Sequence, residues 1–285
     1  MSQSAYAAPM RLNEVVTLLA DNPGSRILAG GQNLLVEPNR SHIAGSLLVD
    51  LRRVAGLSGI QAADGGLRIG AMTTIGTIAA SELVRKVCPV LAEAAELVGD
   101  AQVRNRATLG GAIAEADPAG DLIPVLLVLS ADFDIAGPGQ SRSVQADGFL
   151  TGPNGTTLSA AEVITAVTIP APAPSTGAAY EKMKDPATLY ALCGVAANIT
   201  LSAKGLVTQC RVAVTGSTEH PVRLPEVEAA VTGSQPSDSS LANAASRIDG
   251  PAYRGNFYAS SEYRAHLTRI LTGRALRRAA ARVVQ

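Results

Sequence analysis

Tryptophan is absent from this 285-residue sequence, and aromatic residues make up only 3% of it. Single-stranded nucleic acids are commonly held by stacking bases on aromatic side chains, and this composition offers few such platforms. The formal net charge is zero at pH 7, and no run of lysine or arginine occurs before the arginine-rich C-terminal segment. We therefore do not expect a nucleic-acid-binding protein.

Cysteine and histidine are scarce as well, with three of each. Cys88, Cys193 and Cys210 are scattered and form no CxxC pair, which favours reduced, buried thiols over disulfides. Three cysteines cannot supply the four thiolates of a common iron–sulfur cluster. The histidines are equally dispersed, so we expect no metal site in this chain.

Long apolar runs are also missing. The longest, residues 122–129, contains Pro124 and is far shorter than the roughly 20 residues that cross a bilayer. Residues 1–10 lack a basic region followed by an apolar one, so no signal peptide is visible. We expect a cytoplasmic protein without a membrane span. The 47% hydrophobic and 17% charged residues fit a folded chain with a filled core rather than a disordered one.

The spacing of apolar residues predicts strands alternating with helices in the first part of the chain. Strands are expected at 26–29, 47–51, 67–69, 132–136 and 163–169, and helices at 11–20, 74–98 and 121–130. Pro89 is expected to begin a new helix or to kink the old one, and Pro124 is tolerable in a first turn. This order is typical of an α/β or α+β fold.

Residues 170–177 hold three prolines among small residues, which predicts an exposed connector and a domain boundary. The expected domains are 1–172 and 178–285. After the connector, alternating residues in 195–201 and 206–216 flank a turn at 203–205 and predict an antiparallel hairpin. Helices are expected at 225–231, 240–248 and 262–284.

Residues 28–34 leave a buried strand through two adjacent glycines, Gly30 and Gly31. Glycine permits positive φ and close backbone approach to a ligand, and successive amides in such a turn suit an anion such as a pyrophosphate. Gln32 and Asn33 add side-chain donors. The alternative is a turn that needs glycine for its geometry alone.

A second glycine segment, residues 108–121, predicts a similar turn around Gly110 and Gly111. Asp121 could accept hydrogen bonds from sugar-type hydroxyls, or could simply cap the helix that follows it. Neither segment is a P-loop or a GxGxxG fingerprint, so a Rossmann site is not expected. No serine/histidine/aspartate or cysteine/histidine constellation stands out, so the chemistry would have to come from a cofactor.

Several motifs follow one another along nearly the whole chain. They are Ala29-Gly30-Gly31-Gln32-Asn33-Leu34, Ile69-Gly70-Ala71-Met72-Thr73-Thr74, Val103-Arg104-Asn105-Arg106-Ala107-Thr108-Leu109-Gly110-Gly111, Ala116-Asp117-Pro118-Ala119-Gly120-Asp121, Tyr180-Glu181-Lys182, Asp185-Pro186-Ala187-Thr188-Leu189-Tyr190, Gly194-Val195-Ala196-Ala197, Tyr263-Arg264 and Gly273-Arg274-Ala275-Leu276. In this order and spacing they resemble the medium, FAD-binding subunit of the xanthine dehydrogenase/aerobic carbon monoxide dehydrogenase family.

The resemblance implies an α+β protein. A FAD-binding domain of the vanillyl-alcohol oxidase/MurB (PCMH) type would have two lobes, at about 1–55 and 56–172, with FAD between them. A smaller C-terminal domain with an antiparallel sheet and helices would follow. The family combines such a chain with a large molybdenum-pterin subunit and a small subunit carrying [2Fe-2S] clusters, as a dimer of heterotrimers. Electrons would reach FAD here and leave to an external acceptor, whereas the large subunit would select the substrate.

The same resemblance implies site residues but no catalytic residue. The two glycine segments would hold the diphosphate, and Asp121 would bond the ribitol or ribose region. Lys182 would lie near the flavin, and Tyr190 would lie over the isoalloxazine unless it is a half-buried hairpin tyrosine. The implied FAD-binding residues are Leu28, Ala29, Gly30, Gly31, Gln32, Asn33, Leu34, Val103, Ala107, Thr108, Gly110, Gly111, Ala112, Ala114, Asp121, Ile164, Lys182 and Tyr190.

The chain departs from the family pattern in three places, one of which is a short N-terminal preamble. Ala112 stands where the family commonly has asparagine, which removes one side-chain contact, and residues 36–41 differ from the usual Met-Lys-x-Arg segment. Two other functions stay open. One is a stand-alone FAD oxidoreductase of the same fold that binds its own substrate in the C-terminal domain. The other is a flavin-free scaffold subunit, which Ala112 slightly favours.

Overall fold

The computed structural model describes residues 5–36, 44–248 and 252–283. The first lobe is a small parallel sheet of strands β1 (Ala5–Ala7), β3 (Leu47–Asp50) and β2 (Arg26–Leu28), in that order. Helix α1 (Leu12–Asp21) connects β1 to β2 and buries Val15 and Leu19. These two side chains are four residues apart, the spacing that places both on one helix face.

The second lobe contains a five-stranded antiparallel sheet with helices packed against it. The strand order is β4-β5-β10-β6-β7. The strands are β4 (Ile60–Ala63), β5 (Gly66–Gly70), β10 (Val163–Ile169), β6 (Asp132–Gly137) and β7 (Gln140–Gln145), with a two-stranded ribbon of β8 (Leu150–Gly152) and β9 (Gly155–Thr156). The helices are α2 (Ile75–Ala80), α3 (Glu82–Val87), α4 (Pro89–Glu96), α5 (Ala101–Arg104), α6 (Leu109–Glu115) and α7 (Leu122–Val128).

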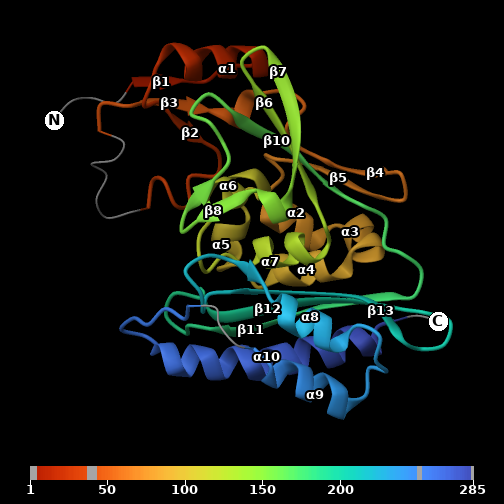
Figure 1. Cartoon of the computed structure of the whole chain (residues 1–285). Helices are drawn as coiled ribbons and strands as arrows, with labels where there is room; N and C mark the ends of the chain where they lie inside the picture. Colours follow the sequence, from red (N-terminus) through yellow and green to blue (C-terminus); the bar gives the residue numbers. More distant parts are fainter. Residues whose placement is uncertain (1–4, 37–43, 249–251, 284–285) are drawn as a thin grey trace.

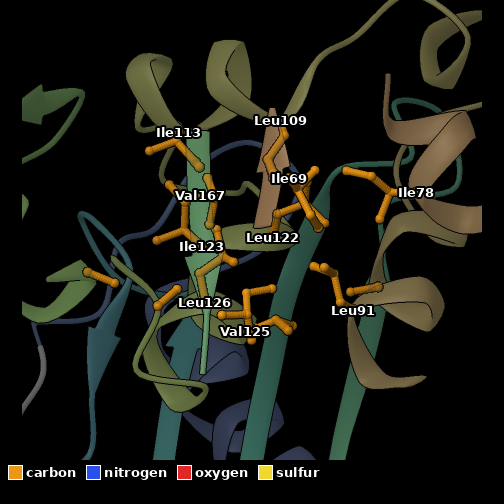
Figure 2. Close-up of a cluster of buried hydrophobic side chains, with 14 of the residues drawn as sticks. Ile69, Ile78, Leu91, Leu109, Ile113, Leu122, Ile123, Val125, Leu126 and Val167 are labelled. Carbon is orange, nitrogen blue, oxygen red and sulfur yellow. The ribbon is translucent and has the colours of Figure 1, made fainter. Parts of the chain in front are cut away.

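The main hydrophobic core lies between this sheet and its helices. Figure 2 shows Ile69 and Val167 of the sheet facing side chains of α6 and α7, among them Ile113 and Leu126. Every residue of α7 is buried, which explains why its sequence is apolar on all sides. The cost of replacing Leu126 by alanine here would be about 2–5 kcal/mol.

The C-terminal part forms a four-stranded antiparallel sheet in the order β11-β12-β13-β14. Its elements are β11 (Thr176–Lys184), β12 (Ala191–Leu201), β13 (Val207–Thr215), β14 (Val222–Arg223), α8 (Pro225–Val231), α9 (Asp238–Ser246) and α10 (Ser261–Ala281). Figure 1 shows α9 and α10 below this sheet, whereas α4 and α7 of the second lobe cover its upper face. Helix α8 packs against β13 and α9. The sheet is therefore buried between two helical layers, and both of its faces carry apolar residues.

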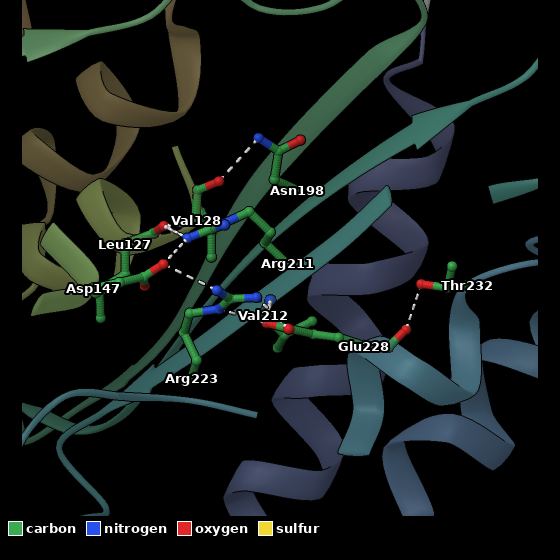
Figure 3. Close-up of polar contacts among 9 residues, drawn as sticks. All are labelled: Leu127, Val128, Asp147, Asn198, Arg211, Val212, Arg223, Glu228 and Thr232. Atoms are coloured by element: carbon green, nitrogen blue, oxygen red, sulfur yellow. Dashed lines mark hydrogen bonds and ion pairs between the residues drawn. The ribbon is translucent and has the colours of Figure 1, made fainter. Parts of the chain in front are cut away.

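Polar side chains of this sheet bind the C-terminal end of α7 (Figure 3). Arg211 donates from Nη2 to the Leu127 carbonyl at 3.0 Å, and Asn198 donates to the Val128 carbonyl at 3.2 Å. Carbonyls in the last turn of a helix have no partner within the helix, so these side chains satisfy them. The guanidinium also complements the negative end of the helix dipole.

The predicted elements are largely confirmed. The region expected to be helical over 74–98 is divided into α2, α3 and α4, and Pro89 begins α4. The predicted hairpin is β12–β13, and the final helices begin within two residues of the prediction. The last helix ends at Ala281, three residues before the expected end at 284. Residues 37–41 of the altered loop lie outside the described residues. No helix in the described ranges is both long and apolar enough to cross a membrane.

One prediction about the second glycine segment is wrong. Residues 109–115 form helix α6 rather than a glycine turn, and Thr108 is its N-cap, accepting from the Gly111 amide at 3.3 Å. The glycines lie in the first helical turn because Gly110 packs against Ala71, where an added Cβ would come within 2.6 Å of the Ala71 Cβ. Close packing, and not a positive φ, therefore requires Gly110.

Candidate functional site

An open cavity lies where the first lobe, the second lobe and the β11–β12 loop meet. Its empty space, with the solvent at its mouth, is about 1300 Å³. It is bordered by both glycine segments, by the turn after α4 and by the residues before α7. The lining residues are Ile27, Ala29, Gly30, Gly31, Gln32, Asn33, Leu34, Val36, Ile75, Val98, Gly99, Val103, Ala107, Thr108, Gly111, Ala112, Glu115, Asp117, Ala119, Gly120, Asp121, Leu122, Ile123, Thr188, Leu189 and Tyr190.

The first glycine segment forms one wall of the cavity. A Cβ on Gly30 would lie 2.2 Å from the Arg106 carbonyl oxygen. Only glycine therefore lets this turn pack against the backbone at Arg106. Gly31 has a φ of +73°, in the left-handed region. The amides of Gly31, Gln32 and Asn33 donate to no acceptor among the described residues. This turn therefore presents free backbone donors beside the cavity, the arrangement that binds anions.

The second glycine segment contributes less hydrogen bonding than expected. The Leu109 amide donates to Thr73 at 3.0 Å and the Gly110 amide to Ala71 at 2.8 Å, so the protein itself occupies both donors. Gly111 lines the cavity, whereas Gly110 is absent from the lining. The expectation that this segment exposes the Gly110 amide is thus wrong, and its main contribution is a wall without bulky side chains.

Asp121 lies in the cavity wall directly before α7. Its side chain does not cap the helix. Instead, Oδ1 accepts a hydrogen bond from the Tyr180 hydroxyl at 2.7 Å, and Oδ2 accepts one from Lys182 Nζ at 2.7 Å. Both donors come from β11, so a carboxylate of the first part of the chain is held by the C-terminal part.

This network is buried. Asp121 is 6% exposed and the Lys182 side chain 2%. Burial raises the pKa of the Asp121 carboxyl, while the Lys182 ammonium and the hydrogen bonds to it act in the opposite direction. Burial also raises the pKa of Tyr180, which keeps its hydroxyl protonated as a donor. Each carboxylate oxygen retains a further lone pair for a ligand hydroxyl.

Tyr190 lies at the mouth of the cavity, 47% exposed. Its loop is held by Asp185, whose Oδ1 accepts from the amides of Ala187 and Thr188 at 2.8 Å each. Burial of part of the ring raises the pKa of the Tyr190 hydroxyl, and nearby carboxylates such as Asp117 raise it further. A partly exposed aromatic ring therefore lines the same cavity as the first glycine turn.

The family models assign the chain. Residues 2–172 match the FAD binding domain in molybdopterin dehydrogenase, and residues 178–279 match the CO dehydrogenase flavoprotein C-terminal domain. The chain belongs to this family of FAD-binding medium subunits. It is an oxidoreductase subunit of the molybdenum hydroxylases and its cofactor is FAD, whereas molybdenum and iron–sulfur centres belong to other subunits of such enzymes.

Relatives and solved structures agree with this membership. The nicotine 6-hydroxylase medium subunit of Paenarthrobacter nicotinovorans is 33% identical over 279 residues, covering 97% of both chains. The carbon monoxide dehydrogenase medium chain of Hydrogenophaga pseudoflava is 37% identical over 211 residues, covering 74% of this chain and 73% of that one. A structure of carbon monoxide dehydrogenase from Hydrogenophaga pseudoflava, lacking the Mo-pyranopterin moiety, superposes with a TM-score of 0.92 at 34% identity over 99% of both chains.

The cavity suits the cofactor of this family. FAD carries an anionic diphosphate, a polyhydroxylated ribityl chain and a flat aromatic ring. The cavity offers free amides at Gly31 to Asn33, a carboxylate at Asp121 and an aromatic ring at Tyr190. Ala112 lines the wall and presents only a methyl group to the cavity.

Five of the implied FAD-binding residues do not line this cavity. Leu28 and Ile164 are buried in the cores, and Gly110 packs on Ala71. Ala114 is exposed on α6, and Lys182 lies behind the wall, where it holds Asp121. All others on the implied list line the cavity.

Sequence reasoning missed other residues of the wall. Val98 and Gly99 follow α4 and carry no local motif that marks a ligand site. Ala119 and Gly120 lie in the motif at residues 116–121, and Thr188 and Leu189 lie in the motif at residues 185–190. These two motifs could therefore have indicated that the four residues line the cavity. Among the described residues, no group of three or more histidine, cysteine, aspartate or glutamate side chains could hold a metal ion.

Proposed function

We propose that this chain is the electron-relay subunit of a heteromeric molybdenum hydroxylase. It takes electrons from iron–sulfur clusters of a partner subunit and passes them to an external acceptor. The observation that carries the proposal is the open cavity, which is lined both by the backbone donors of residues 31–33 and by the half-exposed Tyr190. Bound there, FAD supplies the two-electron and one-electron redox chemistry that side chains lack.

Each wall of the cavity has a separate task in this proposal. The amides of residues 31–33 bind the diphosphate, and Asp121 accepts hydroxyl hydrogen bonds from the ribityl or ribose region. Val103, Ala107 and Ala112 provide apolar contact. Tyr190 covers one face of the ring system at the cavity mouth, where an acceptor can approach. The chain's own residues thus bind and orient the cofactor and keep water from most of it.

The partners follow from the same proposal. A large molybdenum-pterin subunit and a small iron–sulfur subunit would complete a heterotrimer, which would pair as a dimer in the cytoplasm. The medium subunit and medium chain named among the relatives support a multi-subunit assembly. We also propose domain limits of 1–172 and 178–285, supported by the matched ranges and by the connector between β10 and β11.

Three measurements test the proposal. Full-length apoprotein should bind FAD and develop the visible flavin absorbance bands, and the isolated chain should not oxidise the substrate of the complex. The assembled complex should reduce its bound flavin when substrate is added. If the chain never binds FAD, the result supports a flavin-free scaffold subunit instead. If the isolated chain oxidises the substrate, the result supports a stand-alone FAD oxidoreductase.

A further inference from the structure

Tyr180 and Lys182 are neighbours on one face of β11, because residues two apart in a strand point the same way. Their polar atoms reach the two oxygens of the same carboxylate, Tyr180 to Oδ1 and Lys182 to Oδ2 of Asp121. The carboxylate is therefore fixed in rotation by one donor on each oxygen. Neither Tyr180 nor Lys182 lines the cavity, so both act on it through Asp121.

Gly194 makes the Tyr180 contact possible. Gly194 lies on β12, paired with Lys182 in the β11–β12 ladder. A Cβ at this position would lie 2.2 Å from the Tyr180 hydroxyl oxygen and 2.9 Å from Thr215 Cγ2. Real Cβ atoms do not approach so closely, so any other residue would push the hydroxyl away from Asp121. Gly194 does not line the cavity. The room that it leaves for the Tyr180 hydroxyl explains why the motif at residues 194–197 begins with glycine.

The same sheet also holds the backbone that leads into Asp121. Thr215 Oγ1 lies within hydrogen-bond distance of the Pro118 and Gly120 carbonyls, at 2.9 and 3.1 Å. Lys182 Nζ donates in addition to the Leu97 carbonyl at 2.9 Å, directly before the cavity residues Val98 and Gly99. The C-terminal sheet is thus the support on which this wall of the cavity is built.

We propose that Tyr180 is a positioning residue for the FAD site: its hydroxyl, given room by Gly194, holds the Asp121 carboxylate in the orientation that accepts hydrogen bonds from the cofactor's hydroxyl groups. The proposal rests on the assignment of this cavity to FAD made above. Without the hydroxyl, Oδ1 loses the one donor that it has among the described residues, and the carboxylate can turn toward Lys182. The cofactor then meets an acceptor that must be reoriented on binding.

The test is a titration of full-length apoprotein with FAD, followed by flavin fluorescence. Tyr180→Phe keeps the ring and the Asp121–Lys182 pair, and it should raise the dissociation constant about tenfold to hundredfold, the range expected when the cofactor loses a hydrogen bond to a charged group. Tyr253→Phe, at a partly buried tyrosine that does not line the cavity, is the matched control and should leave binding unchanged. Gly194→Ala should reproduce the loss seen with Tyr180→Phe.

A double-mutant cycle separates positioning from a structural role. In an Asp121→Asn background, Tyr180→Phe should change FAD affinity less than about twofold, because the residue through which it acts has already been altered. If Asp121→Asn alone does not fold, the Asp121→Asn/Lys182→Met pair removes the unpaired ammonium and serves as the background. Losses that add in full would overturn the proposal, as would wild-type affinity in Tyr180→Phe.

Ala112→Phe distinguishes this proposal from the cavity assignment itself. The phenyl ring would fill the cavity from α6, on a different element from Asp121. If Ala112→Phe abolishes FAD binding and Tyr180→Phe has no effect, only the positioning role fails. If Ala112→Phe binds FAD like the wild type, the cavity is not the FAD site and both proposals fail.

Discussion

Arg142 and Glu162 form a bidentate ion pair, with Nε 2.7 Å from Oε1 and Nη2 2.9 Å from Oε2. Arg142 lies on the edge strand β7, and Glu162 directly precedes β10. The pair therefore holds the edge of the five-stranded sheet to the segment before β10. The Ser159 amide adds a third hydrogen bond to Oε2 at 2.8 Å. Together these donors lower the pKa of Glu162 from its ordinary value of 4.5 to about 2.

Because the pKa of Glu162 is lowered, the free energy of unfolding should decrease as the pH falls. Because the folded pKa of Glu162 lies below the unfolded one, its stabilisation is complete above about 4.5 and is lost as the pH falls toward about 2. We expect Glu162→Gln to lower the free energy of unfolding by about 1 kcal/mol at neutral pH, since solvent near Arg142 screens the pair. Denaturant unfolding of both proteins at several pH values checks this. A difference that does not shrink on acidification would contradict it.

Gly30 should tolerate no side chain. The Cβ of Gly30→Ala would lie 2.2 Å from the Arg106 carbonyl oxygen, which belongs to the backbone and cannot rotate away. We expect a loss of about 1–3 kcal/mol in unfolding free energy, the usual cost of overpacking, together with weaker FAD binding. Gly148→Ala is the control, because its Cβ would meet nothing within 4 Å. Equal melting temperatures for the two variants would refute the close-approach argument.

Ala112→Asn should restore the side-chain contact that the family pattern has at this position. Ala112 lines the cavity in α6, so the amide would face the cofactor. A gained hydrogen bond is worth about 0.5–1.5 kcal/mol, so we expect FAD to bind about twofold to tenfold more tightly. Ala114→Asn, on the exposed side of the same helix, controls for the lower helix propensity of asparagine. No gain over Ala114→Asn would show that Ala112 is not at a cofactor contact.

Arg211→Met should destabilise the junction between α7 and the C-terminal sheet. The substitution removes the donor to the Leu127 carbonyl and the ion pair with Asp147 while it keeps most of the apolar stem (Figure 3). We expect a loss of about 1 kcal/mol, because the Leu127 carbonyl loses a charged donor but keeps the Ser130 amide at 3.2 Å. The exposed Arg274, replaced in the same way, is the comparison for thermal unfolding.

The three cysteines should be unreactive in the folded protein. All are buried, and burial raises the pKa of Cys88 and Cys210 to about 12 and that of Cys193 to about 11. Since the thiolate is the reactive form, a disulfide reagent at mildly alkaline pH should label none of them until denaturant is added. Rapid labelling of the native protein would contradict the buried positions.

Local sequence signals predicted much of the fold but little of how its parts combine. Periodicity was sufficient for β12 and β13, where apolar residues alternate, and for the start of α4, where Pro89 fits the first turn. The edge strand β7 (Gln140–Gln145) was missed because it is polar and mostly exposed. Helix α6 was interpreted as a turn because two glycines normally disfavour a helix, and only the contact with Ala71 explains them.

The same limit applies to the site. The first glycine turn was recognisable because free amides follow from its local sequence. Tyr180 was not, since its importance depends on Asp121, distant in sequence, and on the missing side chain of Gly194 on another strand. Ile164 was expected in the pocket but lies in the core, because side chains of β10 are buried on both faces of the sheet.

Helix α7 is bound at both ends by the C-terminal sheet, through Asp121 at its start and through the Leu127 and Val128 carbonyls at its end. A chain cut before β11 would lose the donors to Asp121 and the side-chain donors to those carbonyls, and it would expose the apolar faces of α4 and α7 that pack on this sheet. The two family domains are therefore expected to unfold in one cooperative transition, although they match separate models. A protein without its second domain would also lose the support of its flavin site. Natural selection therefore has a physical reason to keep the two domains in one chain.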